Sequence, residues 1–275
     1  MKHILIPTDF SVYSWNALQY AISFLKEIET TFYFLHVSPL LIDDEDLIDN
    51  PSASQESENT IQNNLNNLIE KAQKIANKDK HTFEALHDHL LFVNSIRNQV
   101  KEKGIDMIIM GTKGIANQED STLGSYTEDV ITRVKCNTLI IPNKTKFNTL
   151  KEVVFPTDFN ILFKNNVLNT ISDILNNYKS RLNVLNISKK EKPLTSLQKI
   201  NKECLEDSLN DEQLEFHFVS NKNIENALQL FIENREVDMI AIVAKNLNFS
   251  QRILFRPKVA RISYHTEIPF LILHE

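Results

Sequence analysis

Three of the four glycines in this 275-residue chain lie in one short stretch, at Gly111, Gly114 and Gly124, and Ser125 follows the last of them. Glycine makes up roughly 7% of an average protein, so a chain this poor in glycine concentrates it where the backbone needs freedom. Glycines let backbone N–H groups approach an anion closely, and a helix start adds unpaired N–H groups and a positive dipole end. The pattern therefore predicts a phosphate-binding loop.

The alternative is that these glycines only form turns. The fourth glycine, Gly104, is explained in that way, because it ends a predicted helix just before a strand. Two better-known phosphate-binding patterns, GxxxxGK[ST] and GxGxxG after the first strand, are absent from the sequence. We also find no HExxH motif, no adenylating SGGxDS-type loop and no evident Ser/His/Asp set. We therefore expect a binding protein and not an enzyme.

The sequence repeats itself once. Residues 3–10 read HILIPTDF and residues 152–159 read EVVFPTDF, so each half opens with an apolar run that ends in Pro-Thr-Asp-Phe. Farther along, residues 105–110 align with residues 237–242 at a constant offset of 132 positions. A repeat of this length predicts two similar domains in tandem.

Each copy alternates apolar runs with segments of helical spacing. Runs such as residues 32–37 and 182–187 are largely apolar, which is typical of parallel strands that are covered on both faces. Each half is therefore predicted to be an α/β domain with a parallel sheet and helices on both faces. We place the boundary in the polar stretch at residues 144–150, which gives domains of residues 1–146 and 147–275.

Charge and composition exclude several classes of function. The net charge of −6 comes from the first domain, since residues 147–275 carry 16 basic and 16 acidic side chains. A nucleic-acid partner needs a basic surface, so neither domain is expected to bind DNA or RNA. No apolar run approaches the roughly 18 residues of a membrane span, and the N-terminus shows no signal-peptide pattern. The two cysteines, Cys136 and Cys204, form no disulfide framework, so a reducing cytoplasm is the expected location.

The glycine loop resembles the G-x2-G-x9-G-[S/T] signature of the ATP-binding members of the universal stress protein family. Three further segments resemble family landmarks: ILIPTDFS at residues 4–11, LHV at 35–37 and DMIIMGTKG at 106–114. The likeness extends to both halves, so the chain resembles a tandem universal stress protein. The resemblance implies an open five-stranded parallel sheet in the order 3-2-1-4-5 in each half. It also implies a nucleotide at the switch point between the first and fourth strands.

The resemblance further implies which residues hold the nucleotide. The end of the first strand would lie near the ribose or adenine, and the end of the second strand would offer backbone groups to the adenine. The fourth strand and the glycine loop would hold the ribose and phosphates. In that order, the implied residues are Pro7, Thr8 and Asp9; Val37; and Met110, Gly111, Gly114, Gly124, Ser125, Tyr126 and Thr127. The implied ligand is ATP, with or without Mg²⁺.

Some acidic residues near this loop allow other interpretations. Asp9 could instead cap a helix, because Asp158 repeats it in the half that lacks the glycines. Glu119 and Asp120 lie within the loop and would repel phosphates unless they point outward or share a Mg²⁺ ion, while Lys113 offsets them.

The second half departs from the signature. At the constant offset, the positions of Gly111, Gly114, Gly124 and Ser125 are taken by Val243, Asn246, Arg256 and Pro257. Proline suits the first turn of a helix but removes one N–H group that would face a phosphate. The second domain is therefore predicted to keep the fold and to lack the nucleotide site.

Two other groups of residues are given structural interpretations. His81, His87 and His89 alternate along the third predicted strand and could ligate zinc. No fourth ligand is evident, so we favour a surface or edge strand and expect no metal site. Cys136, just before the last strand of the first domain, is interpreted as a buried structural thiol in preference to a redox-active one.

We interpret the chain as a cytoplasmic ATP-binding protein of the stress response that senses or stores the nucleotide and acts through partners. A non-nucleotide interaction scaffold of the same fold and a slow ATPase are the alternatives. Because family members commonly pair domains through their last strands, the resemblance implies that the two halves form a pseudo-dimer within one chain. Homodimerisation of whole chains is a further level of assembly that it allows.

Overall fold

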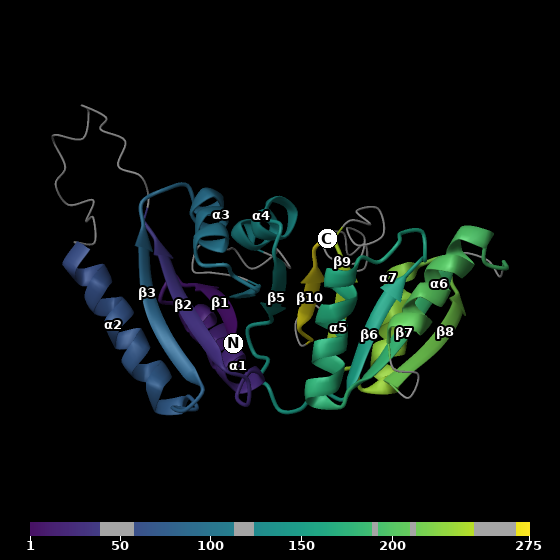
Figure 1. The fold of residues 1–275 in the computed structure, drawn as a ribbon, viewed down its shortest axis with the longest axis horizontal. Coiled ribbons are helices and arrows are strands. Elements are labelled where there is room, and N and C mark those ends of the chain that lie inside the picture. The colour runs from purple at the N-terminus through teal and green to yellow at the C-terminus, as the bar shows by residue number, and fades with distance from the viewer. Residues whose placement is uncertain (39–57, 113–123, 189–191, 210–212, 245–267) are drawn as a thin grey trace.

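The computed structural model describes residues 1–38, 58–112, 124–188, 192–209, 213–244 and 268–275 (Figure 1). Seven residues of the sequence analysis lie outside these ranges: Lys113, Gly114, Glu119, Asp120, Asn246, Arg256 and Pro257.

The first half alternates strands and helices as predicted. Its elements in chain order are β1 (Lys2–Pro7), α1 (Val12–Phe24), β2 (Thr30–Val37), α2 (Glu58–Ile75), β3 (His81–Asp88), α3 (Phe92–Glu102), β4 (Met107–Gly111), α4 (Ser125–Arg133) and β5 (Asn137–Ile141). Local sequence explains several boundaries. The Ser11 side chain caps α1 by accepting from the N–H of Ser14, and Gly104 follows α3 with a φ of 60°, which confirms its predicted turn role.

The second half repeats this order. Its elements are β6 (Glu152–Thr157), α5 (Asn165–Tyr178), β7 (Arg181–Ser188), α6 (Ser196–Ser208), β8 (Leu214–Ser220), α7 (Ile224–Arg235), β9 (Met239–Val243) and β10 (Phe270–Leu273). The fourth helix expected here falls within residues 245–267, outside the described ranges. The predicted boundary between residues 146 and 147 falls in the segment that joins β5 to β6.

The ten strands in the described ranges form one sheet in the order β3-β2-β1-β4-β5-β10-β9-β6-β7-β8. Every neighbouring pair is parallel except β5 and β10, which are antiparallel. Each half therefore has the strand order 3-2-1-4-5, and the predicted fold class is confirmed. The central strands are the most buried, whereas most residues of the outer strands β3 and β8 are half-buried or exposed.

The described helices cover both faces of this sheet (Figure 1). Helices α1, α2, α5 and α6 contribute to one hydrophobic core cluster, which runs through both halves. Helices α3, α4 and α7 contribute to a second cluster on the opposite face. Among the described helices, none combines the length and apolar character needed to cross a membrane.

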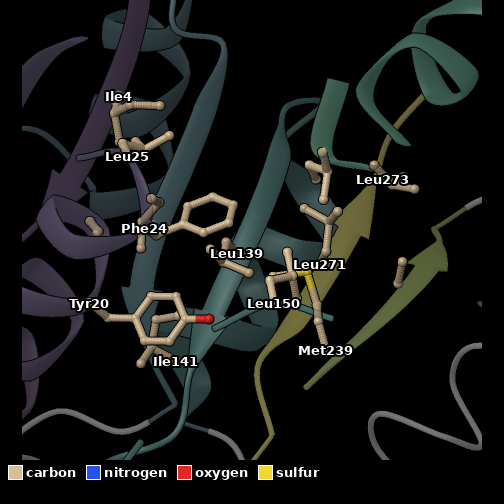
Figure 2. Packing of buried hydrophobic residues seen from close by; sticks show 14 of the residues in the cluster. Ile4, Tyr20, Phe24, Leu25, Leu139, Ile141, Leu150, Met239, Leu271 and Leu273 are labelled. Carbon is tan, nitrogen blue, oxygen red and sulfur yellow. The ribbon is translucent and has the colours of Figure 1, made fainter. Parts of the chain in front are cut away.

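The two halves meet at the β5–β10 pair. In the antiparallel register, Leu139 lies opposite Leu271 and Ile140 lies opposite Phe270. Figure 2 shows Leu139 and Leu271 beside the loop residue Leu150 at this junction, with Leu273 farther along β10, and all are buried. The intrachain pairing through the last strand of each half, which the sequence analysis predicted, is therefore present in the structure.

Aromatic side chains reinforce the junction. Phe24 of α1 stacks on Tyr178 of α5 with 5.0 Å between ring centroids, and Phe147 contacts both rings edge-on. Tyr20 also packs edge-on against Phe147, at 5.5 Å. The Tyr178 hydroxyl donates to the Phe24 carbonyl. Burial raises the pKa of the Tyr20 and Tyr178 hydroxyls above the ordinary value, so both remain neutral.

We predict that Phe24→Ala lowers the free energy of unfolding by about 3–5 kcal/mol, the usual cost of deleting a buried phenyl ring. Phe24 is 3% exposed and connects the two halves. Urea denaturation followed by circular dichroism measures the change. Leu230→Ala, at a side chain that is 55% exposed, is the control and should change stability by less than about 0.5 kcal/mol. A loss below about 1 kcal/mol in Phe24→Ala would contradict a shared core.

Candidate functional site

A crevice is expected where β1 and β4 lie side by side. Leu5 of β1 is paired with Ile108 of β4, and the helices that follow the two strands leave toward opposite faces. Helix α1 packs in the first core cluster and α4 in the second. In an open α/β sheet, this change of direction creates a crevice beyond the carboxyl ends of the strands, where ligands bind. Counting along the register from Leu5, Pro7 lies beside Met110 at this edge.

The two ends of the glycine loop are fastened to each other. The Gly124 N–H donates to the Thr112 carbonyl at 2.7 Å, and the Thr112 N–H donates to Ile141 at 3.1 Å. The Thr127 hydroxyl, which is buried, donates to the Gly111 carbonyl at 3.0 Å. The loop that contains Gly114 therefore leaves β4 and returns to α4 at one fixed point, although Gly114 itself lies outside the described residues.

Helix α4 begins without a side-chain cap. Its N-cap is Gly124, with φ −72° and ψ 149°, and it makes no side-chain capping hydrogen bond. Any residue adopts these angles, so positive φ does not explain this glycine. The remaining explanation for a glycine here is that it places no side chain over the first turn of α4. The N–H groups and the helix dipole at this turn favour an anion.

The three residues after Gly124 contribute in different ways. Ser125 is exposed, so its hydroxyl is open to a ligand. The Tyr126 ring packs against Phe92 of α3, with 4.6 Å between centroids. Because the Thr127 hydroxyl already binds Gly111, Thr127 can reach a phosphate only through its backbone N–H group.

The turn after β1 has the same form in both halves. The Thr8 hydroxyl accepts from the N–H of Phe10 at 3.0 Å, and an Asp9 carboxylate oxygen accepts from Ser11 at 3.1 Å. In the second half, Thr157 and Asp158 accept in the same way from Phe159 and Asn160, each at 3.0 Å. Both phenylalanines have positive φ, near 60° and 54°.

The repeated turn shows one role of Asp9 that both halves share. A turn that is identical in a half without the glycine loop is explained by local hydrogen bonding, as in other turns that begin with aspartate. Asp9 therefore has a structural role that needs no nucleotide, while its contact with a ribose or adenine stays a prediction.

The end of β2 faces the crevice through its backbone. The Leu35 carbonyl accepts from Thr8, and Pro7 opposite Leu35 is the last pair of β1 with β2. Backbone groups of alternate residues point to the same side of a strand, so the N–H and C=O of Val37 point past the end of β1. Met110, by contrast, is 7% exposed and its side chain belongs to the core, so only its backbone lies at the edge.

The sequence analysis did not assign a role to His36. Its Nδ1 lies 2.9 Å from the Thr8 carbonyl, so it carries the hydrogen and donates, and its ring stacks on Phe10 at 4.6 Å. Asn186 holds the Thr157 carbonyl in the same way in the second half, at 3.0 Å. The matched position in the repeat is the signal that could have revealed this contact.

In the second half, the described residues at the ends of β6 and β9 pack closely together. Val243 stands where β4 has Gly111, and its side chain is buried in the core. Together with Ile161 and Phe163, it leaves a cavity of about 10 Å³ at the ends of β6 and β9. That is about the volume that a single water molecule needs, so the described residues leave no room for a phosphate group between these two strand ends.

Two other candidates from the sequence also have places in the structure. His81 is buried and its Nε2 lies 3.0 Å from the Leu25 carbonyl, at the opposite end of β3 from His87 and His89. Cys136 is 6% exposed, and its thiol donates to the Ile105 carbonyl at 3.6 Å. Burial, with a smaller contribution from Asp106, raises the pKa of Cys136 to about 12.

Comparisons with known proteins agree with this architecture. A model of the universal stress protein family matches residues 1–142. Universal stress protein MJ0531 of Methanocaldococcus jannaschii is 29% identical over 152 residues, which cover 53% of this chain and 84% of that protein. Universal stress protein YxiE of Bacillus subtilis is 26% identical over 149 residues, covering 50% and 97%.

A solved structure extends the similarity to both halves. The crystal structure of a universal stress protein from Archaeoglobus fulgidus covers 99% of this chain and 98% of its own, with a TM-score of 0.66 and 16% identity. This match shows a common fold over the full length of the chain.

We predict that Cys136 resists alkylation in the native protein at pH 8, because a thiol with a pKa near 12 is almost entirely protonated there. Iodoacetamide labelling followed by mass spectrometry measures this. Cys204, which is partly exposed, should react first, and Cys136 should react at a comparable rate only in urea. Native labelling of Cys136 as fast as Cys204 would show that the thiol is accessible and would support a redox role.

Proposed function

Because this chain belongs to the universal stress protein family, we propose that its first half binds ATP, or a closely related adenine nucleotide, in the β1–β4 crevice. The observation that carries the proposal is the start of α4. There, an N-cap without a side chain leaves the first turn open directly beside Gly111. The resemblance of the glycine loop to that of ATP-binding family members supports the same ligand.

The nucleotide is proposed to lie across three strand ends. The adenine contacts the backbone of Val37, the ribose lies near Thr8 and Asp9, and the phosphates lie at the start of α4. The open N–H groups and helix dipole favour the negative charge of the phosphates, and Ser125 adds an exposed hydroxyl. Gly114 and any Mg²⁺ ligands in residues 113–123 lie outside the described residues.

The proposed role is regulation through binding, in a cytoplasmic response to stress. The glycine loop occurs in the first half alone, so a single nucleotide per chain is proposed. An interaction scaffold that binds no nucleotide is the competing function. It would use the same fold, with the glycines serving only to shape the loop.

We predict that Gly124→Asp weakens ATP binding by at least about 100-fold. A unit charge about 4 Å from a phosphate costs several kcal/mol at an effective dielectric constant of about 20. Aspartate is itself a good N-cap at these backbone angles, so α4 should be preserved and the loss will not reflect unfolding. Isothermal titration calorimetry measures the affinity.

The matched control is Asn223→Asp, which adds the same charge at the N-cap of α7 in the second half and should leave ATP binding unchanged. Equal affinity in Gly124→Asp and the wild type would show that the phosphates bind elsewhere. No ATP binding by the wild type would favour the scaffold.

Turnover is predicted to stay below about 1 per second, at the lower limit of typical enzymes. Rapid phosphoryl transfer needs a group that orients the attacking water and a cation on the developing charge. Among the described crevice residues, Asp9 and His36 already hold backbone groups of the scaffold. A phosphate-release assay checks this. Faster turnover that disappears in Glu119→Gln or Asp120→Asn would make the protein an ATPase.

A further inference from the structure

The outer edge of the first half carries side chains of metal-ligand type that the proposed nucleotide site does not use. His87 and His89 lie at the carboxyl end of β3, and Glu58 is the first residue of α2. One ligand atom of each lies within 4.8 Å of the other two. In the part of the chain that the structure describes, no other three His, Cys, Asp or Glu residues approach one another this closely.

The spacing of these atoms is close to what a metal ion needs. In a tetrahedral zinc site with bonds of about 2.0–2.1 Å, neighbouring ligand atoms lie about 3.4 Å apart. The two imidazole rings already lie side by side, with 4.4 Å between centroids. Glu58 and His89 are exposed, so small side-chain rotations can close the remaining gap without disturbing the core.

A neighbouring hydroxyl group fixes the orientation of the His87 imidazole ring. The Ser38 hydroxyl lies 2.8 Å from Nε2 of His87. If Nε2 donates to Ser38, then Nδ1 has a free lone pair directed away from that bond. Metal-binding histidines usually hold their second ring nitrogen in a hydrogen bond of this kind, which sets the tautomer and the ring plane.

The electrostatic surroundings also suit a cation. Burial lowers the pKa of His87, and the neighbouring His89 and His36 lower it further, so the ring is held neutral as a ligand must be. The carboxylates of Glu58 and Asp88 act on His87 in the opposite direction and place negative charge beside the group.

The group is separate from the proposed phosphate site. β3 and β4 are three strand spacings apart in the sheet order, which is about 14 Å at about 4.8 Å per strand. A metal ion at β3 therefore cannot ligate phosphates held at the start of α4.

The repeat provides an internal comparison. Val37 pairs with Asp88 in the first half and Ile187 pairs with Val219 in the second, so His87 and His89 correspond to Phe218 and Ser220. Neither the phenylalanine nor the serine side chain has a nitrogen atom that could bind a metal ion. The second half keeps the strand and lacks the ligands, so the fold alone does not require histidines at this edge.

We propose that Glu58, His87 and His89 bind one divalent transition-metal ion, with Zn²⁺ the best match to two imidazoles and a carboxylate and with water in the fourth position. The ion would tie the start of α2 to the end of β3. This inference goes beyond the nucleotide proposal and does not depend on it.

Calorimetric titration of the full chain with ZnCl₂, in a buffer without phosphate or nucleotide, tests the proposal. We expect one Zn²⁺ per chain with micromolar or tighter affinity. Both His89→Ala and Glu58→Gln, at exposed side chains, should weaken binding by at least about tenfold. Asp88→Asn is the control, because it removes a neighbouring carboxylate charge without removing a proposed ligand. It should change the affinity by less than about threefold.

Histidine ring signals in NMR spectra provide a second readout. Zn²⁺ should shift the rings of His87 and His89 together and leave that of His217, at the edge of the second half, unchanged. The proposal would be overturned by the absence of saturable binding, by wild-type affinity in both ligand variants, or by an equal loss in Asp88→Asn. None of these outcomes bears on ATP binding, which is measured without Zn²⁺.

Discussion

The antiparallel pair of β5 and β10 is the contact on which the rest of this structure depends. In a single half, either strand would be the bare edge of a five-stranded sheet, and an apolar edge of that kind invites pairing with other chains. Here each edge covers the other, so the ten strands form one sheet and a single hydrophobic cluster runs from Ile4 to Leu273. The stacked rings of Phe24 and Tyr178 extend the contact from the strands to the helices. Each half thus completes the core of its neighbour.

This arrangement explains how the second half can keep its fold without the glycines of the first half. Its contribution to the junction comes from β10, which pairs with β5, and from α5, whose Tyr178 stacks on Phe24. At the ends of β6 and β9, the side chains of Phe163 and Val243 are buried, which adds buried apolar surface. The first half leaves the start of α4 without a side-chain cap. An open helix end is less stable than a capped one, and sites of this kind are commonly retained where function requires them.

The polar residues common to both halves belong to the scaffold. Thr8 and Thr157 hold the same turn, and His36 and Asn186 hold the same carbonyl across the adjacent strand. The differences between the halves lie elsewhere, after β4 and β9 and at the ends of β3 and β8. A protein built from a repeat can therefore be divided into the residues that both copies need for folding and those that only one copy has, which are the candidates for function.

The sequence by itself determined the two-domain repeat, the α/β class and the phosphate-loop hypothesis. Apolar runs, helical spacing and the PTDF repeat are local patterns, and local patterns fix secondary structure and strand type. The strand order and the likeness to a tandem universal stress protein came from the resemblance of the motifs. Tertiary structure decided what depends on distant residues meeting. It showed that the Thr127 hydroxyl holds Gly111, and that Phe163 packs beside Val243 at the ends of β6 and β9. It also brought Glu58, at the start of α2, close to His87 and His89, at the end of the strand that follows this helix. No spacing along the chain encodes such contacts, because they arise only when a helix packs back onto the strand that follows it.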